Sequence, residues 1–375
     1  MIYADNAATT RLDEEAFEAM KPFLLEEYGN PSQPYIFTRV PKKALRQARE
    51  YIAECICADP DEIFFTSGGT ESDNWAIKGG AFSDSDKRAT VTSAFEHHAI
   101  LNSCKSIERL KFPVAYMWPT SDGIITPEIL SKYITESTRL VSVMFANNEI
   151  GSIQPIKKLC RIAHEYGALF HTDAVQAVGH ISINVHDLDV DMLSASAHKF
   201  NGPKGVGFLY IRSGTNILPN NDGGAQEDGM RAGTENVAGI VAMATALKKN
   251  VDLITSTAAK LTSMEHTLVG MLQAAGVNFI RNGSKEHHLP GLLSLSFPGF
   301  EGEAMLHRLD LMGICIATGA ACDSKKTQIS HVLNAIGLDE SNARGTIRIS
   351  FGRFNDIADA EKLAQAIIKI VNNPR

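Results

Sequence analysis

The chain has 375 residues, of which 44% are hydrophobic and 21% are charged, and its formal net charge is −7. This length favours one large and one smaller domain, and the composition is typical of a soluble globular protein. The negative charge and the lack of a basic stripe argue against a nucleic-acid partner. The sequence contains no run of about 18 apolar residues that would predict a membrane span.

The N-terminus shows no basic segment followed by an apolar one, so no signal peptide is predicted. Six cysteines in a chain of this length do not resemble a disulfide framework, and we expect a reduced, cytoplasmic protein. Cys55 and Cys57 are too close together for a Cys-x-x-Cys pair, which argues against a structural zinc site.

Two amphipathic helices are predicted at the start of the chain. Residues 13–27 place apolar side chains on one face, with Asp13 as a suitable N-cap and Pro22 at a position where it can kink the helix. A loop rich in glycine and proline at 29–34 separates this helix from a second one at 42–57.

A short strand at 62–66 runs into a glycine-containing turn and then a helix at 74–82. Thr70 and Asp73 have the spacing of a capping box. Glycines before a helix N-terminus leave backbone N–H groups free beside the positive end of the helix dipole, which suits a phosphate. An ordinary strand-to-helix turn explains these residues equally well.

Strands then alternate with helices, which predicts a doubly wound, mostly parallel α/β sheet. The predicted strands cover residues 90–94, 113–118, 140–145, 168–173, 190–197 and 206–211, with a helix at 156–166. Four polar residues, His97, Asn148, Asp173 and Lys199, lie at or just beyond the ends of such strands. Ligands of these sheets bind beyond the carboxyl ends of the strands, so we expect the four side chains at one site.

The last third of the chain has a different pattern. A glycine-rich loop at 223–234 is followed by a helix at 237–254, which continues into or adjoins a helix to residue 275. Short strands at 277–280, 292–297 and 346–351 then alternate with helices at 302–312 and 357–371. We therefore predict a large domain over 1–254 and a smaller α+β domain over 255–375, with the segment 1–15 packing near the smaller one.

Lys199 follows a predicted core strand, where an unpaired ammonium is costly to desolvate. A lysine there can instead form an imine with pyridoxal 5'-phosphate (PLP), although a surface lysine just past a strand remains the simpler reading of this residue alone. Asp173 would then pair with the ring nitrogen of PLP and His97 would stack on its face. The phosphate would lie among Gly69, Thr70, Ser196 and His198. Taken singly, Asp173 also suits a helix N-cap, and His97 suits a buried structural histidine.

Seven segments together resemble the cysteine desulfurases, which are PLP enzymes of the class V aminotransferase family. They occur in the family's order at residues 3–10, 66–74, 147–151, 171–176, 197–207, 229–234 and 347–352. The resemblance implies the PLP-dependent transferase fold, with a large doubly wound domain and a smaller C-terminal domain.

The resemblance also implies roles for individual residues in binding the cofactor and the substrate. Lys199 would carry the PLP imine, Asp173 would pair with the ring nitrogen, His97 would stack, and Gln176 would meet the ring hydroxyl. The phosphate would be held by Gly69, Thr70, Ser196 and His198. Thr234 would reach the phosphate of the neighbouring subunit's cofactor, which implies a homodimer with shared active sites. Asn148, beside the cofactor, and Arg348 would hold the substrate carboxylate, and a guanidinium suits that task because it binds carboxylates in a bidentate manner.

Cys322 decides which reaction the resemblance implies. It lies in a loop of small and polar residues, where Lys325 and Lys326 can lower the pKa of its thiol. In desulfurases the matching cysteine takes sulfur from L-cysteine, releases L-alanine and keeps a persulfide for iron–sulfur cluster or thio-cofactor assembly on an acceptor protein. An inert loop thiol is the alternative.

Two departures from the family pattern bear on substrate and partner. Residues 33–41 replace the family's Ser-x-His segment, and Lys325 and Lys326 stand where relatives have small or neutral residues. A selenocysteine lyase or an aminotransferase on the same scaffold therefore stays open as an alternative. A catalytically silent, partner-binding homologue is disfavoured because Lys199, Cys322 and the other site residues are intact.

Overall fold

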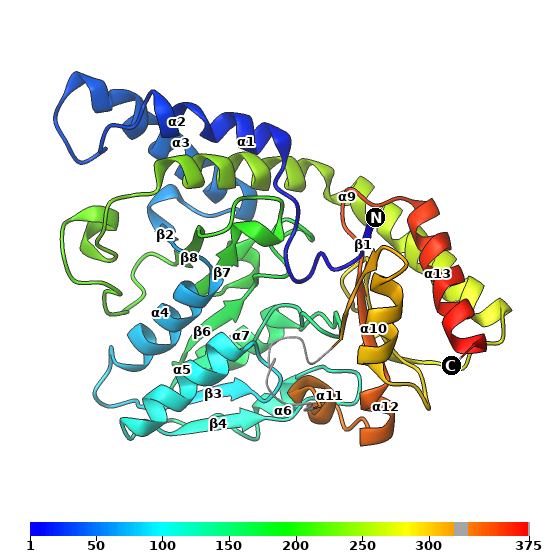
Figure 1. Cartoon of the computed structure of the whole chain (residues 1–375). Helices are drawn as coiled ribbons and strands as arrows, with labels where there is room; N and C mark the ends of the chain where they lie inside the picture. The colour runs from blue at the N-terminus through cyan, green and yellow to red at the C-terminus, as the bar shows by residue number, and fades with distance from the viewer. Residues whose placement is uncertain (319–328, 374–375) are drawn as a thin grey trace.

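A computed structural model describes residues 1–318 and 329–373. At its centre lies a seven-stranded sheet with the order β2-β8-β7-β6-β5-β3-β4 (Figure 1). The strands are β2 (Ile63–Thr66), β3 (Ala89–Ser93), β4 (Val114–Met117), β5 (Thr138–Ser142), β6 (Leu169–Asp173), β7 (Met192–Ser196) and β8 (Gly207–Ile211). Only β8 runs against its neighbours, since it pairs antiparallel with both β7 and β2. The predicted mostly parallel α/β sheet is confirmed.

Both faces of this sheet are buried. Leu140, Met192 and Leu209 pack on one face in a cluster with α4 (Gly69–Ala81) and α5 (His98–Arg109). Their chain neighbours Val141 and Leu193 belong to the cluster on the opposite face, with α3 (Arg39–Ile56) and α7 (Ile156–Glu165). Successive strand side chains point to opposite faces, so strands covered on both sides read as continuous apolar runs.

A smaller four-stranded sheet has the order β12-β13-β10-β9. Its strands are β9 (Ile280–Asn282), β10 (Leu292–Ser296), β12 (Ala317–Thr318) and β13 (Thr346–Ser350). The helices α10 (Gly302–Asp310) and α13 (Ile357–Asn372) contribute to its apolar cluster, as do Ile2 and Ala4 from the N-terminus. The strand β1 (Ile2–Tyr3) pairs with β11 (Ile314–Cys315), so the first residues lie beside this smaller sheet (Figure 1).

One 38-residue helix, α9 (Val237–Ala274), connects the two parts of the chain (Figure 1). Its first half packs against α1 (Glu14–Met20) and α3, and its second half packs against α13 and belongs to the cluster of the smaller sheet. The division that we predict at 254/255 falls inside this continuous helix, and the two domains stay a proposal.

Local expectations in the N-terminal half need three corrections. The predicted helix 13–27 is two helices, α1 (Glu14–Met20) and α2 (Pro22–Leu25), because proline, which lacks an N–H, begins the second one. Asp13 is the N-cap of α1 as predicted and accepts hydrogen bonds from the N–H groups of residues 15 and 16. The helix predicted at 74–82 already begins at Gly69, so Thr70 and Asp73 lie inside its first turns and form no capping box.

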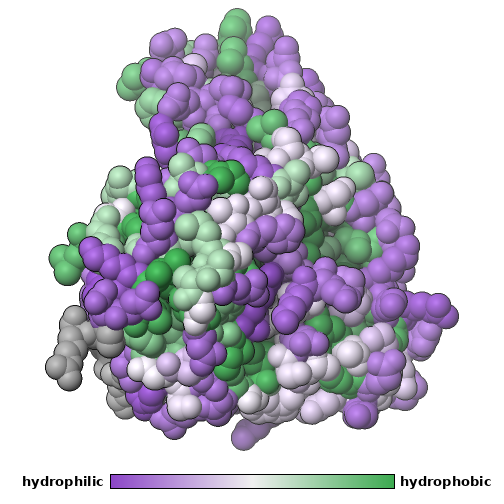
Figure 2. All heavy atoms as spheres, turned by 90° about the vertical axis from the view of Figure 1, so that its right-hand side faces the viewer, coloured by the Kyte–Doolittle hydropathy of each residue, from purple (hydrophilic) through white to green (hydrophobic). Residues whose placement is uncertain are grey.

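The remaining helices are short. They are α6 (Pro127–Leu130), α8 (Val185–Leu188), α11 (His331–Ala335), α12 (Glu340–Arg344) and the 3-10 turns Ile36–Thr38, Pro60–Glu62, Ala197–Lys199 and Gln226–Gly229. Across the described ranges, no helix combines the length and the apolar character that a membrane crossing requires. Hydrophilic side chains are spread between smaller apolar areas over the face seen in Figure 2.

Candidate active site

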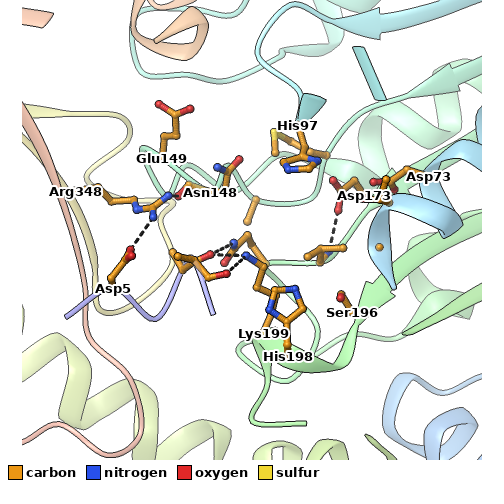
Figure 3. A pocket seen from close by; sticks show the side chains of 18 of the residues that line it. Asp5, Asp73, His97, Asn148, Glu149, Asp173, Ser196, His198, Lys199 and Arg348 are labelled. Atoms are coloured by element: carbon orange, nitrogen blue, oxygen red, sulfur yellow. Dashed lines mark hydrogen bonds and ion pairs between the residues drawn. The ribbon is translucent and has the colours of Figure 1, made fainter. Parts of the chain in front are cut away.

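A cavity of about 350 Å³ lies where β6 and β7 end, facing β13 of the smaller sheet (Figure 3). Ten of the twelve predicted site residues line it, namely Gly69, Thr70, His97, Asn148, Asp173, Gln176, Ser196, His198, Lys199 and Arg348. Thr234 is exposed and does not line this cavity, and Cys322 lies outside the described residues together with Lys325 and Lys326. The fold therefore brings together residues that are up to 279 positions apart in the chain, from Gly69 to Arg348.

Asp173 is the last residue of β6 and is 4% exposed. Its Oδ1 accepts a hydrogen bond from the N–H of Val175 at 2.9 Å within a turn, so it does not cap a helix. Burial raises the pKa of Asp173, and the nearby His97 and Lys199 partly oppose that shift. A carboxyl group held in this way by the backbone can serve as the partner of a protonated ring nitrogen.

His97 is the N-cap of α5, and its Nδ1 accepts a hydrogen bond from the N–H of Ala99 at 3.1 Å. Burial lowers the pKa of His97, and Asp173 opposes that shift. With Nδ1 occupied as an acceptor, the neutral ring carries its proton on Nε2 and presents a flat face to the cavity (Figure 3).

Lys199 ends the 3-10 turn that follows β7. Its Nζ donates to the carbonyl oxygens of Ala7 at 2.6 Å and Ala8 at 2.8 Å. The amide of Gln176 also donates to Ala7 O, at 2.9 Å. The N-terminal segment thus forms one wall of the cavity, and the sequence pattern of that segment alone does not reveal this.

The N-terminus of α4 forms the opposite end of the cavity and suits a phosphate. Its N-cap, Gly68, has φ of 144° and no side chain to cap the first turn, so the dipole end and its N–H groups stay available to an anion. A Cβ on Gly69 would lie 2.6 Å from Val175 Cγ2, so any larger residue there would force a shift at this end of the cavity. Burial, with Lys199 and Lys204, lowers the pKa of the neighbouring His198 to about 4, so this histidine is a neutral hydrogen-bonding group.

Arg348 projects from β13 into the cavity and is 7% exposed. Its Nη2 lies 2.7 Å from Asp5 Oδ1 and its Nη1 donates to the backbone carbonyl of Asn148 at 3.0 Å (Figure 3). Its Nε is buried and has no hydrogen-bond partner among the described residues. This fork of donors can bind a carboxylate, and Asn148 holds the guanidinium through its main chain.

Three carboxyl groups of the cavity, Asp5, Asp73 and Glu149, were not predicted as site residues. All three lie inside segments that carry the family resemblance, at 3–10, 66–74 and 147–151, and that position is the signal that could have found them. Glu149 Oε2 accepts a hydrogen bond from the hydroxyl of Ser330, and burial raises the pKa of Glu149 to about 7. Thr318, the last described residue before 319–328, also lines the cavity. Ser330, shortly after that segment, bonds to Glu149, so the described residues on both sides of 319–328 contact the site.

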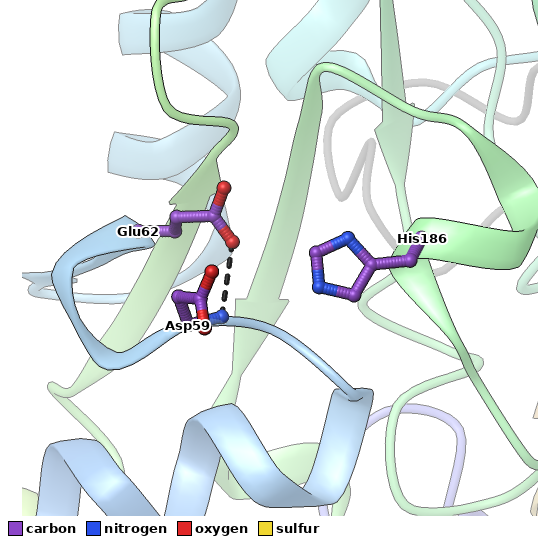
Figure 4. Close-up of side chains that lie close together, drawn as sticks. All are labelled: Asp59, Glu62 and His186. Carbon is purple, nitrogen blue, oxygen red and sulfur yellow. Dashed lines mark hydrogen bonds between the residues drawn. The ribbon is translucent and has the colours of Figure 1, made fainter.

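A second cluster is formed by Asp59, Glu62 and His186 (Figure 4), and none of the three lines this cavity. Its side-chain ligand atoms lie within 4.8 Å of one another. The two Glu62 oxygens, however, accept hydrogen bonds from the N–H groups of Asp59 and Ser213 at 3.0 and 2.8 Å. Glu62 therefore fastens the 3-10 turn to the end of β8, which accounts for its burial without a metal ion.

Comparison with known proteins gives consistent matches over the whole chain. The model of the aminotransferase class-V family matches residues 2–363. A cysteine desulfurase IscS from Dictyoglomus turgidum is 46% identical over 375 residues, which are 100% of this chain and 95% of that protein. A solved NifS-like protein has a TM-score of 0.93 and 38% identity, with 99% of each chain covered. A structure described as SspA in complex with cysteine has a TM-score of 0.83 and 35% identity, covering 94% of this chain and 99% of that one.

Proposed function

The chain belongs to the aminotransferase class V family, and from this membership and its cavity we propose that it is a PLP-dependent cysteine desulfurase. The observation that carries the proposal is the grouping of Lys199, Asp173 and the N-terminus of α4 around one cavity, with Arg348 on the facing wall. The substrate is L-cysteine, and the products are L-alanine and a persulfide on Cys322.

The residues of the cavity fit PLP. Lys199 would hold its aldehyde carbon, Asp173 would accept a hydrogen bond from the ring nitrogen, and Gln176 would face the ring hydroxyl. The phosphate would lie at the α4 N-terminus, among Gly69, Thr70, Ser196 and His198. When bound, PLP supplies an electron sink for the substrate carbon atoms.

The chain's own side chains then have distinct tasks. Arg348 binds the carboxylate of L-cysteine, and Asn148 and Asp5 fix the orientation of the guanidinium. His97, which is neutral because burial lowers its pKa, would stack on PLP and can pass a proton through Nε2. Lys199 Nζ, at the end of its turn, can exchange a proton with the substrate Cα.

Cys322 is the proposed sulfur acceptor. Its thiolate forms an S–S bond with the substrate sulfur as the Cβ–S bond of the substrate breaks, and the electron pair of that bond stays on carbon. The carbon then takes up a proton and becomes the methyl group of alanine. Lys325 and Lys326 favour the thiolate by their charge.

We further propose a homodimer in which Thr234 completes the phosphate site of the neighbouring subunit. In a single chain Thr234 is exposed and away from the cavity, which agrees with a role toward a second copy.

An acceptor protein would receive the persulfide sulfur. Every cysteine in the described ranges is free of disulfides, which supports our placing the protein in the cytoplasm.

The function is tested by cysteine turnover on the purified, PLP-loaded protein, with alanine and sulfide measured in the presence of a thiol reductant. We expect Cys322→Ser to lose at least about 100-fold in sulfide release while it keeps the visible band of bound PLP, because a hydroxyl does not replace the thiolate as a sulfur acceptor. Cys57→Ser, at an exposed cysteine away from the cavity, is the matched control and should retain the wild-type rate. Lys199→Ala should lose the visible band.

Sulfide release at the wild-type rate from Cys322→Ser would disprove the persulfide mechanism. Selenide release from selenocysteine by that same variant would favour the selenocysteine lyase alternative. A protein that gains no visible band when PLP is added would overturn the whole assignment.

A further inference from the structure

Asp73 is a buried carboxyl group for which the proposed function gives no role. It lies in the first turns of α4, is 1% exposed and lines the same cavity as Asp173. Polar side-chain atoms of Asp73, His97 and Asp173 lie within 4.8 Å of one another, and Figure 3 shows the two carboxyl groups next to each other. Both Asp73 oxygens are buried and lack a hydrogen-bond partner within the described part of the chain.

The groups around Asp73 do not neutralise a negative charge. Asp173 faces it from the end of β6, and Glu96 adds a second carboxyl from the turn before α5. On the remaining sides stand His97, the hydroxyl of Ser194 in β7, and His171 in β6. In residues 1–318 and 329–373, Asp73 forms no ion pair with a lysine or an arginine.

His171 is the one basic side chain at ion-pair distance from Asp73 in these ranges, with Nε2 3.9 Å from Oδ1. Its two ring nitrogens already bond to the hydroxyls of Ser142 and Ser194, each at 2.9 Å. Burial lowers the pKa of His171 to about 3, so the ring is neutral. An ionised Asp73 would therefore be a buried charge without a counter-charge, next to a second carboxylate.

We propose that Asp73 is a second carboxyl group of the ring-nitrogen site that stays protonated, a positioning residue that leaves Asp173 as the single charged carboxylate facing the cofactor. This inference rests on the proposed function for the identity of the cofactor. When two carboxyl groups lie this close together, the state in which one of them is protonated is favoured over the state in which both are ionised. One net negative charge then matches one protonated ring nitrogen.

The electrostatics of the site support this assignment. Burial first, and the charge of Asp173 second, raise the pKa of Asp73 well above its usual range, and Ser194 only partly opposes the shift. The backbone N–H of Val175 bonds to Asp173 and has no counterpart at Asp73, so a negative charge on the pair is stabilised at Asp173 rather than at Asp73.

The test uses protein labelled with ¹³C at the aspartate side-chain carboxyls, so that glutamates such as Glu96 give no signal. Carboxyl shifts are followed against pH in the PLP-free chain, and Asp73→Asn identifies the signal of Asp73. We expect that signal to remain in the protonated position at pH 7 and to move to a lower midpoint in Asp173→Asn, where the like charge is gone. Asp252→Asn, at an exposed site, is the control and should leave the signal unchanged.

A midpoint for Asp73 near pH 4 would overturn the proposal, as would a midpoint that Asp173→Asn does not alter. Should Asp73→Asn fail to fold, Asp73→Glu identifies the signal in its place, because a glutamate carboxyl carries no label. This measurement needs no PLP, so its result does not depend on the proposed function. A chain that binds no PLP would overturn the proposed function, while the carboxyl shifts would still decide whether Asp73 is protonated.

A second readout is the pH dependence of thermal unfolding of the PLP-free chain. A carboxyl whose pKa is raised in the folded state contributes most to stability below its unfolded pKa, and that contribution is lost as pH rises toward the folded pKa. The Asp73→Asn variant does not undergo this loss of stability. The melting temperature of the variant minus that of wild type should therefore increase from pH 4 to pH 7. A difference that stays constant with pH would mean a merely structural role and would contradict the proposal.

Discussion

Replacing Glu96 by glutamine changes a carboxyl group that is fully buried between β3 and α5. Its Oε1 accepts hydrogen bonds from the hydroxyl of Ser93 at 2.5 Å and the N–H of Met144 at 2.9 Å, while Oε2 has no partner among the described residues. The proton therefore sits on Oε2, and a glutamine can keep the acceptor at Oε1 and place its NH2 group where that proton lies.

Burial raises the pKa of Glu96 from 4.5 to about 8. At about 1.36 kcal/mol per pH unit, this difference amounts to roughly 5 kcal/mol of unfolding free energy over the whole titration, of which roughly 4 kcal/mol falls between pH 4.5 and pH 8. Because the pKa of Glu96 is raised in the folded state, the stabilisation is fully present below pH 4.5 and is lost as pH rises toward 8. Glu96→Gln cannot ionise, so it should gain roughly 4 kcal/mol relative to wild type between pH 4.5 and pH 8.

The assay is urea unfolding of the PLP-free protein at pH 5, 6, 7 and 8, with wild type and variant compared at each pH. Taking the difference removes the pH dependence of stability that Glu149 contributes equally to both proteins. Glu136→Gln, at an exposed glutamate, is the matched control and should show no pH-dependent gain. An equal difference between Glu96→Gln and wild type at all four pH values would refute the reasoning, because it would mean that Glu96 titrates alike in the folded and unfolded chain.

Two further substitutions test the two ends of the cavity. Gly69→Ala places a Cβ 2.6 Å from Val175 Cγ2, and we expect the PLP dissociation constant to rise about 10-fold or more because the phosphate end must shift. Gly270→Ala, where a Cβ meets nothing within 4 Å, should leave PLP binding unchanged, and equal PLP titrations of the two variants would contradict this expectation. Arg348→Lys should raise KM for L-cysteine about 10-fold or more and keep the visible PLP band, because an ammonium cannot form the bidentate contact. The conservative change Arg344→Lys, at an arginine outside the cavity, is its control, and an unchanged KM in Arg348→Lys would place the substrate carboxylate elsewhere.

Short-range pattern determined the large sheet and the location of its site. The apolar runs before Asp173 and Lys199 are strands covered on both faces. A strand in that environment needs apolar side chains on both sides, so its sequence is a continuous apolar run. Because parallel strands end at the same edge of a sheet, strand-end residues could be placed together without coordinates. The motif resemblance supplied Gln176 and Arg348, which spacing alone does not connect.

Contacts between distant segments were decided only by the tertiary structure. The carbonyl of Ala7 meets both Lys199 and Gln176, and no local pattern predicts where an N-terminal segment will lie. The spacing of Thr70 and Asp73 suggests a capping box, but α4 begins at Gly69 and leaves its first N–H groups facing the cavity. Asp73 is consequently buried beside Asp173. Sequence pattern reports the burial of a residue's own segment, whereas the charge state of a buried carboxyl depends on which groups other strands bring to it.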